Sequence, residues 1–427
     1  MKVYVEVNSL YTEEVKYIFS VFAFNKGVKF EWINDVNYSD FSIGHSSKNT
    51  LRISIAFYEQ ISSGIFDHNF HFKNGPNISF EDGEHDLLST AFYVLTCAQE
   101  LGSSEKDKFG RFQFKNSFQA KFNVEKENLV QMLFDKLETL LSSKLPARKK
   151  SFRSRIFLSH DIDTVYGALM QDGFSALKRF RFDQVFKIIL SNLLKGPSWK
   201  NIDRIMDIES EYDFYSTFFW LVNKGRVDEN LSNSDYDLND NVIQRFISEI
   251  TSGKWSNGLH KSAADDSFQK ELLKLGVSVK ANRYHYLKFD LKTDFPVLAA
   301  SPLSFDSSLG FAEASGFRSG YGQPYRPYDF SQRRALDFIE CPLNIMDTTA
   351  FNYKKLSGTE FLSETISFCE RNSTNCVISV LFHNNIISDY KFKDYLVAFK
   401  KLLAYFYESG LKPIGPEEII TEYYYEY

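Results

Sequence analysis

The sequence of 427 residues has few cysteines and no long apolar run. Its four cysteines, Cys97, Cys341, Cys369 and Cys376, form no C-x-x-C pair, so the disulfide framework of a secreted domain is not indicated. No apolar run is long enough to span a bilayer. The residues after Met1 lack the positively charged region and apolar core of a signal peptide. We therefore expect a cytoplasmic protein without a transmembrane segment.

A large excess of positive charge is also missing. The formal net charge is −5, which gives no electrostatic reason to expect a nucleic-acid partner. The hydrophobic share of 43% and the charged share of 25% are typical of a soluble globular protein. Aromatic residues are abundant at 16%, which suits a well-packed core and a groove that stacks on flat ligands such as sugar rings.

The length favours two or three domains. Residues 142–153 are polar, basic and interrupted by Pro146, as in a linker, so we predict an N-terminal domain over 1–150 and a second domain over 151–427. The first part mixes short strands and helices, which indicates a smaller α/β domain. The second part alternates strands and helices, which favours a parallel sheet or barrel. The predicted strands of the second part begin at 155 and continue at 215–222, 255–260, 281–289, 295–305, 337–346, 376–382 and 411–414.

Residues 173–200 form a helix-like and locally basic segment. Its apolar positions, such as Phe174 and Phe186, could pack against the rest of the domain, cover a pocket or touch a membrane surface. Packing against its own domain is the favoured interpretation, and weak contact with a membrane surface is the alternative.

The stretch 155–164 begins apolar, as a buried strand does, and ends in two carboxylates. Alternation along an extended backbone places Asp161 and Asp163 on the same side, at the strand end where α/β sheets and barrels keep their chemistry. Two such acids resist joint ionisation unless a cation lies between them or one holds a proton. This pattern is typical of a metal-assisted hydrolase, with one acid on the metal and its neighbour as base. A strand end with two solvated acids is the alternative.

The four histidines after residue 150 are placed alike. His160, His260, His285 and His383 each stand at or just after the C-terminal part of a predicted strand. A structural role is the simplest interpretation for each one alone. All four occupy the rim where βα folds keep active sites, and we predict that His260 and His383 converge there with Asp161 and Asp163.

Four motifs in this order resemble a known family. They are S-H-D-I-D at 159–163, G-L-H at 258–260, R-Y-H-Y at 283–286 and L-F-H-N at 381–384. Together they resemble the polysaccharide deacetylases of the NodB-homology type, and more closely a bacterial branch with an N-terminal companion domain. Further segments similar to that branch lie at 91–96, 107–112, 305–311, 316–320 and 345–347.

The resemblance implies a distorted (β/α) barrel that uses a divalent metal, usually zinc, to remove an acetyl group from an N-acetylated sugar. It implies that Asp161 is the base and that Asp163 and His260 bind the metal. It also implies that Arg283 orients the base and that His383 is the acid that protonates the leaving amine. By the same analogy, we expect a role in surface-polysaccharide or glycolipid synthesis, with a sugar or glycan as substrate.

One departure from the family pattern leaves an alternative open. The second motif of the family carries a further histidine at the position that corresponds to Ala264. Either the third ligand comes from Asp265, Asp266 or His285, of which we favour His285 because it restores an imidazole, or metal binding is weak. The alternative is a catalytically silent carbohydrate-binding or scaffolding member of the same fold. Our candidates for substrate contacts near the motifs are His160, Tyr286, Asp306, Arg318 and Asn384.

Overall fold

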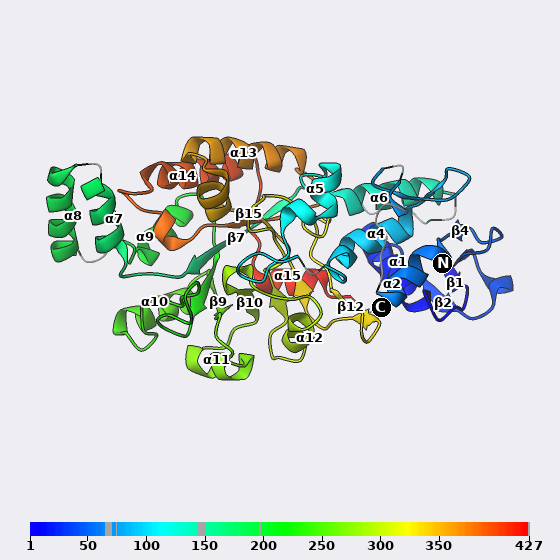
Figure 1. Cartoon of the computed structure of the whole chain (residues 1–427). Coiled ribbons are helices and arrows are strands. Elements are labelled where there is room, and N and C mark those ends of the chain that lie inside the picture. Colours follow the sequence, from blue (N-terminus) through cyan, green and yellow to red (C-terminus); the bar gives the residue numbers. More distant parts are fainter. Residues whose placement is uncertain are drawn as a thin grey trace.

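The computed structural model describes residues 1–64, 71–73, 75–103, 105–143, 145, 151–178, 180–195 and 198–425 (Figure 1). Residues 144 and 146–150 of the predicted linker lie outside this part of the chain. Within it, no helix is both long enough and apolar enough to cross a bilayer.

The N-terminal region is built on a four-stranded parallel sheet in the order β2-β1-β3-β4. Its strands are β1 (Lys2–Val5), β2 (Glu31–Ile33), β3 (Phe41–Gly44) and β4 (Leu51–Arg52), and β5 (Ile78–Ser79) pairs antiparallel with β6 (His85–Asp86). Its helices are α1 (Thr12–Lys26), α2 (Ile55–Ser63), α4 (Leu87–Leu95), α5 (Phe118–Phe122) and α6 (Leu129–Leu140). Short 3₁₀ turns are η1 (Val36–Tyr38), η2 (Ala98–Glu100) and η3 (Phe114–Asn116). This region therefore combines a parallel sheet with helices.

The second region contains an eight-stranded sheet in the order β14-β11-β10-β9-β8-β7-β16-β15, and all its ladders are parallel. Its strands are β7 (Arg155–Ile162), β8 (Thr217–Leu221), β9 (Ser256–Lys261), β10 (Ala281–Tyr284), β11 (Phe305–Asp306), β14 (Ile339–Glu340), β15 (Leu343–Met346) and β16 (Val377–Leu381). Only Cys341 and Pro342 separate β14 from β15, although these strands lie at opposite edges of the sheet. The sheet therefore curls until its two edges meet, so the expected parallel, barrel-like α/β arrangement is confirmed.

Alternation along the strands separates the inside of the curled sheet from its outside. Phe157 of β7 packs inward with Phe219 of the neighbouring β8 and with Phe305 of β11, which lies across the curled sheet. Helix α15 (Pro416–Tyr423) adds Ile419 to the same cluster. Leu158 instead joins the larger cluster on the outer side. Apolar residues thus close the inside near the start of the strands, and the polar ends of the strands remain available for a site.

Helices flank the sheet, with α13 and α14 on one side and α10 to α12 on the other (Figure 1). They are α9 (Ile202–Ser210), α10 (Asn241–Ser252), α11 (Phe268–Leu275), α12 (Asp294–Ala299), α13 (Gly358–Arg371) and α14 (Lys393–Glu408). Smaller elements are η4 (His285–Leu287), the π-helix η5 (Thr349–Lys354), η6 (Asn384–Ile386), and the hairpin of β12 (Tyr328–Asp329) and β13 (Arg334–Ala335). Capping residues fix several starts: Ser357, for example, forms a capping box with Glu360 at the first turn of α13.

Two predicted strands are largely wrong. The segment 295–305 contains most of α12 and only the first residue of β11. Pro296 is compatible with the helix because it lies in the first helical turn, where its missing N–H costs no hydrogen bond. The segment 411–414 contributes an isolated bridge between Ile156 and Pro413 instead of a strand.

The helix-like segment at 173–200 is a helical hairpin, α7 (Ala168–Lys178) and α8 (Phe182–Lys195). The chain turns at Phe180, which has a φ of 53°. Many apolar side chains of the hairpin are exposed, including Phe174 and Phe186. The expectation that they pack against their own domain is therefore wrong.

The N-terminal region and the barrel share one hydrophobic cluster. Backbone bonds join them as well: Val130 donates its N–H to the carbonyl oxygen of Gly320 (2.8 Å), and Phe317 donates to that of Glu125 (2.7 Å). Gly316 has a φ of +141°, and a Cβ there would lie 2.2 Å from the Glu125 oxygen. Only glycine fits this contact.

Candidate metal and catalytic site

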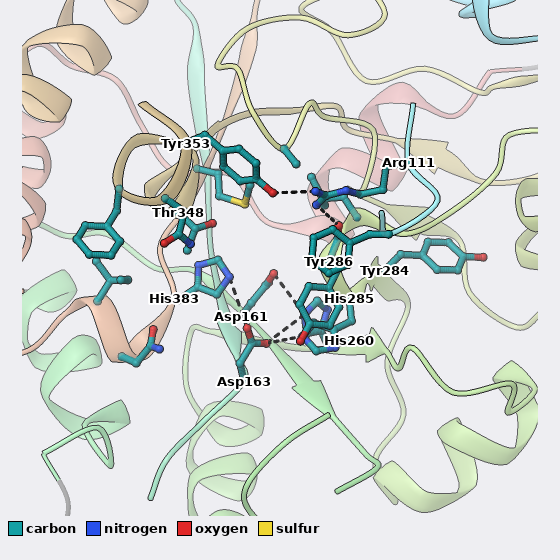
Figure 2. A pocket seen from close by; sticks show the side chains of 18 of the residues that line it. Arg111, Asp161, Asp163, His260, Tyr284, His285, Tyr286, Thr348, Tyr353 and His383 are labelled. Carbon is teal, nitrogen blue, oxygen red and sulfur yellow. Dashed lines mark hydrogen bonds and ion pairs between the residues drawn. The ribbon is translucent and has the colours of Figure 1, made fainter. Parts of the chain in front are cut away.

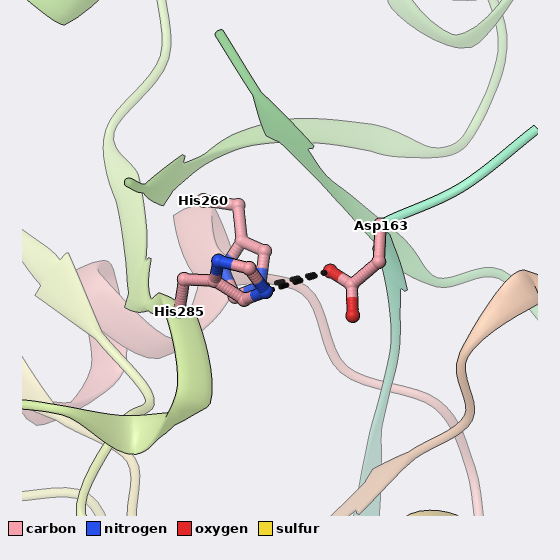
Figure 3. A group of neighbouring side chains, drawn as sticks. All are labelled: Asp163, His260 and His285. Carbon is pink, nitrogen blue, oxygen red and sulfur yellow. Dashed lines mark ion pairs between the residues drawn. The ribbon is translucent and has the colours of Figure 1, made fainter. Parts of the chain in front are cut away.

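Three side chains that could hold a metal ion converge at the C-terminal ends of the strands (Figure 3). Asp163 directly follows β7, His260 belongs to β9, and His285 directly follows β10. Their ligand atoms all lie within 4.8 Å of one another. Asp163 Oδ1 is 3.3 Å from His260 Nε2 and 3.6 Å from His285 Nε2.

The hydrogen bonds of this group leave one imidazole nitrogen facing the acids. His260 Nδ1 lies 2.9 Å from the carbonyl oxygen of Arg283, so an N–H at Nδ1 donates there and Nε2 is the atom that a metal could bind. Burial would lower the pKa of His260, but Asp161 and Asp163 raise it, so a cation would have to displace a proton from Nε2. Burial lowers the pKa of His285, which favours a neutral ring. Burial alone would raise the pKa of Asp163, but the facing His285 and His260 hold it well below its usual range. Asp163 Oδ1 is buried and receives no well-formed hydrogen bond, so this set of donors suits a divalent metal.

A second acid is held by an arginine. Arg283 Nη1 donates to Asp161 Oδ1 (3.0 Å) and to Ser159 Oγ (2.9 Å), while Nε donates to the carbonyl oxygen of Ser307 (2.8 Å). The guanidinium is fully buried and lies over the ring of Phe219 at 4.5 Å. These contacts fix the rotamer of Asp161, whose other oxygen, Oδ2, lies 3.5 Å from His260 Nε2.

A third unit consists of His383 and Asp347. His383 Nδ1 lies 2.7 Å from Asp347 Oδ1, and the backbone N–H of His383 donates to Oδ2 at the same distance. Burial would lower the pKa of His383, but the Asp347 carboxylate raises it to about 10. Nε2, on the other side of the ring, is 3.7 Å from Asp163 Oδ2. Sequence reasoning gave Asp347 no role, although it directly follows β15, beside β16, where a strand-end acid is a signal.

All three units open into one pocket of about 540 Å³ (Figure 2). Three residues of the N-terminal region, Lys108, Phe109 and Arg111, line the same pocket. Arg111 Nη1 donates to the carbonyl oxygen of Tyr286 (2.8 Å), and Nη2 donates to the Tyr353 hydroxyl (2.7 Å). The Phe109 ring stacks on Tyr286 with 5.5 Å between centroids. Both regions of the chain therefore build the pocket.

His160 does not face this pocket, so its predicted substrate contact is wrong. The side chain is fully buried, with Nδ1 2.9 Å from the Phe382 carbonyl oxygen and Nε2 2.8 Å from Glu209 Oε1. The reason is the two-residue period of β7, which turns His160 outward when Asp161 turns inward.

Three other predicted substrate contacts are buried away from the pocket. Asp306 accepts bonds from Asn282 and Ser308, Arg318 pairs with Glu100, and Asn384 donates to the carbonyl oxygens of Thr164 and Trp199. Their contacts hold strands and loops in place. Of the five candidates, Tyr286 lines the pocket.

The alternative third ligands also lie elsewhere. Asp265 is exposed, and Asp266 pairs with Lys270 and Lys274. His285 is the candidate that the structure brings to Asp163 and His260.

Comparison with known proteins gives the following matches. The model of a family of unknown function (DUF7033) matches residues 2–146. No curated protein matches the sequence. One matching structure, from Mycobacterium smegmatis, is assigned as a polysaccharide deacetylase; it has 12% identity and a TM-score of 0.40, with 64% of this chain and 91% of that chain covered.

Two further structures match at lower TM-scores. One, from Bordetella bronchiseptica, is assigned as a polysaccharide deacetylase involved in O-antigen biosynthesis (14% identity, TM-score 0.32, 64% of this chain and 89% of that chain). The other is a CE4 family pseudoenzyme from Bacillus anthracis (11% identity, TM-score 0.29, 64% of this chain and 67% of that chain).

Proposed function

We propose that this protein is a metal-dependent hydrolase that removes an N-acetyl group from a sugar. The observation that supports it best is that three chemically different units open into one pocket: the ligand group of Asp163, the Asp161–Arg283 pair and the His383–Asp347 pair. Hydrolysis of an amide needs these three functions, which are carbonyl polarisation, removal of a proton from water, and protonation of the leaving nitrogen.

Asp163, His260 and His285 would hold the metal. Two imidazoles and a carboxylate with a remaining open position are typical of catalytic zinc sites. A bound divalent cation supplies a Lewis acid and lowers the pKa of water toward about 7. Because His260 and His285 come from neighbouring strands, the ligand set does not need a side chain at Ala264.

Asp161 is the proposed base. Its Oδ1 is occupied by Arg283, which leaves Oδ2, near His260, to accept a proton from water. The arginine touches Asp161 and not the pocket, so it acts by positioning the carboxylate.

His383 is the proposed acid. Asp347 holds Nδ1, so Nε2 is the atom that can donate to the leaving nitrogen. The C–N bond then breaks, the acetyl carbon gains the water oxygen, and acetate and a free amino sugar leave.

The walls of the pocket support a sugar as substrate. Its volume lies in the range of about 300–1,000 Å³ that small-molecule sites occupy. Phe109, Tyr286 and Tyr353 present aromatic rings there, and such rings stack well on the apolar faces of sugars. With the family resemblance, this favours an N-acetylated sugar from surface-polysaccharide or glycolipid synthesis.

Zinc affinity, measured by competition with a chelator, tests the ligand set. We expect His285→Ala to weaken zinc binding by about tenfold or more, as losses in a metal site commonly do. Asp265→Ala should leave it unchanged, and so should His85→Ala, the matched control at an exposed histidine. Unchanged affinity in His285→Ala would contradict the assignment.

Acetate release from N-acetylated sugars tests the reaction. Zinc-loaded wild-type protein should release acetate from at least one such sugar, whereas Asp161→Asn should not. A zinc-loaded protein that binds these sugars without releasing acetate would instead support the silent carbohydrate-binding alternative.

A further inference from the structure

The α7–α8 hairpin concentrates exposed apolar surface. Twelve of the 24 exposed large hydrophobic side chains in the described chain lie within 166–194. The two helices pack chiefly against each other, and they project at the end of the molecule opposite the N-terminal region (Figure 1). Apolar patches of this kind mark interaction sites.

One side of α8 carries a continuous apolar stripe. Its members recur at helical spacing and are all exposed: Phe182, Phe186, Ile189, Leu190, Leu193 and Leu194. Val185 and Ile188 fall outside the stripe and are half-buried. The stripe is therefore separate from the side on which the helix packs. It remains uncovered, with Phe186 67% and Leu193 77% exposed.

The charge around the stripe is opposite to that of the whole chain. By sequence, 166–200 contains six basic residues (Lys178, Arg179, Arg181, Lys187, Lys195 and Lys200) against two acids (Asp172 and Asp183). The segment is thus net +4, whereas the chain is net −5. Apolar stripes flanked by lysine and arginine are typical of helices that lie on anionic lipid. A second copy would oppose one positive hairpin with another, and protein interfaces are depleted of lysine.

We propose that the α7–α8 hairpin binds an anionic lipid surface. The apolar stripe inserts into the membrane–water interface, and the basic residues are attracted to the anionic lipid headgroups.

The hairpin arises at the rim of the pocket. Helix α7 begins five residues after Asp163, and its Asp172 is buried and accepts a bond from Ser198 Oγ (3.3 Å). Lys391, which lines the pocket, interacts electrostatically with Asp172. A docked hairpin would therefore bring the pocket near the membrane, where it suits a lipid-linked sugar. This choice of substrate depends on the proposed function, but lipid binding itself does not.

Cosedimentation of the full-length protein with vesicles tests the proposal. We expect binding to phosphatidylcholine vesicles that contain phosphatidylglycerol, little binding to phosphatidylcholine alone, and weaker binding at high salt. The double variant Phe186→Ser/Leu193→Ser should lose about tenfold or more in affinity, because it removes two side chains that insert. The matched control Leu273→Ser/Val397→Ser, which changes exposed apolar residues of α11 and α14, should bind like wild type.

Three outcomes would overturn the proposal. They are no binding to anionic vesicles, equal binding by Phe186→Ser/Leu193→Ser, and a dimer in analytical ultracentrifugation that this variant dissociates without any vesicle binding. The vesicles carry no sugar, so failure here is distinct from a failure to release acetate from a water-soluble substrate.

Discussion

Asp161 and Asp163 stand two residues apart on one strand end, yet their neighbours give them different chemistry. Asp161 faces the buried Arg283 guanidinium, whereas Asp163 faces the imidazoles of His260 and His285. Arginine cannot be a metal ligand, but it fixes a carboxylate by hydrogen bonding. Because of this difference, the two acids can divide the roles of base and ligand.

Replacement of Asp161 by asparagine tests that division. We expect Asp161→Asn to keep the zinc content and lower turnover by about 10²–10⁴-fold, the usual contribution of a general base. Asparagine still accepts a bond from Arg283 but cannot take a proton from water. Rates of acetate release and zinc content check this, with Asp265→Asn, at an exposed acid, as control. A wild-type rate in Asp161→Asn would show that another group is the base.

Replacement of His383 separates the acid from the base. We expect His383→Ala to reduce hydrolysis of an N-acetyl sugar much more than that of an aryl acetate, because a phenolate leaves without protonation and an amine does not. Asp347→Asn should show the same preference with a smaller loss, since the imidazole remains but is no longer held by a carboxylate. Steady-state rates on both substrates measure it. Equal losses on both would argue against an acid role.

For single residues, the two-residue period of a strand predicts which side chains face the site better than single motifs do. It places Asp161 and Asp163 together, and the same rule turns His160 to the opposite face. The pairing of Asp347 with His383 was not predicted, although Asp347 follows a strand and lies in the motif at 345–347, because the two residues become neighbours only when β15 and β16 pair.

At the scale of elements, the segment 337–346 shows where periodicity is insufficient. The sequence predicts one strand there, but Pro342 has no N–H for a ladder, and the segment divides into β14 and β15 at opposite edges of the sheet. The exposure of α8 could not be predicted either. Its apolar stripe has the same pattern whether it covers a domain or faces solvent.

The first turn of α4 gives a pH-dependent prediction. Asp86 caps this helix, and its carboxylate accepts the N–H groups of Ser54 (2.6 Å) and Ser89 (2.9 Å). Burial raises the pKa of Asp86 from 3.8 to about 6. Because the pKa of Asp86 is higher in the folded state, its protonated form favours folding. This stabilisation is fully present below about pH 4 and is lost as the pH rises through about 6.

The variant Asp86→Asn should remove this dependence and keep the cap, since asparagine is a good N-cap residue. Between pH 4 and pH 7, the unfolding free energy of the wild type should fall relative to that of the variant by up to roughly 3 kcal/mol. This value corresponds to the rise of about two units in the pKa of Asp86 on folding. Urea unfolding at several pH values measures it. Parallel pH curves for the two proteins would rule the prediction out.

At the scale of the whole molecule, the N-terminal region is part of the site as well as of the core. Its helices share a hydrophobic cluster with the barrel, and its loop with Lys108, Phe109 and Arg111 lines the pocket. The sequence predicts two α/β regions and contains the motif at 107–112, but it does not predict that this loop contacts the barrel and lines the pocket. Within its own loop Arg111 pairs with Asp107 (2.6 Å). Its partners in the barrel are Tyr286 and Tyr353, which lie 175 and 242 residues away along the chain.

Arg111 therefore provides the test of cooperation between the two regions. Its guanidinium donates to the backbone of Tyr286 and to the hydroxyl of Tyr353, and not to any of the three proposed metal ligands. We expect Arg111→Ala to raise KM for the sugar by about tenfold, the size of one lost charge-assisted bond, with a smaller change in kcat and unchanged zinc affinity. Arg111→Lys should not restore KM, because one ammonium cannot reach both partners with the geometry of the planar fork.

A second arginine of the N-terminal region supplies the matched control. Arg52 Nη2 donates to both carboxylate oxygens of Asp82 (2.9 and 2.7 Å), and its guanidinium lies over the ring of Phe80. Arg52 does not line the pocket. Arg52→Ala removes the same side chain and breaks a comparable ion pair, but it should leave KM unchanged. If both variants raise KM equally, the effect comes from general loosening of the N-terminal region. If neither does, the loop at 107–112 forms a wall of the pocket that the substrate does not use.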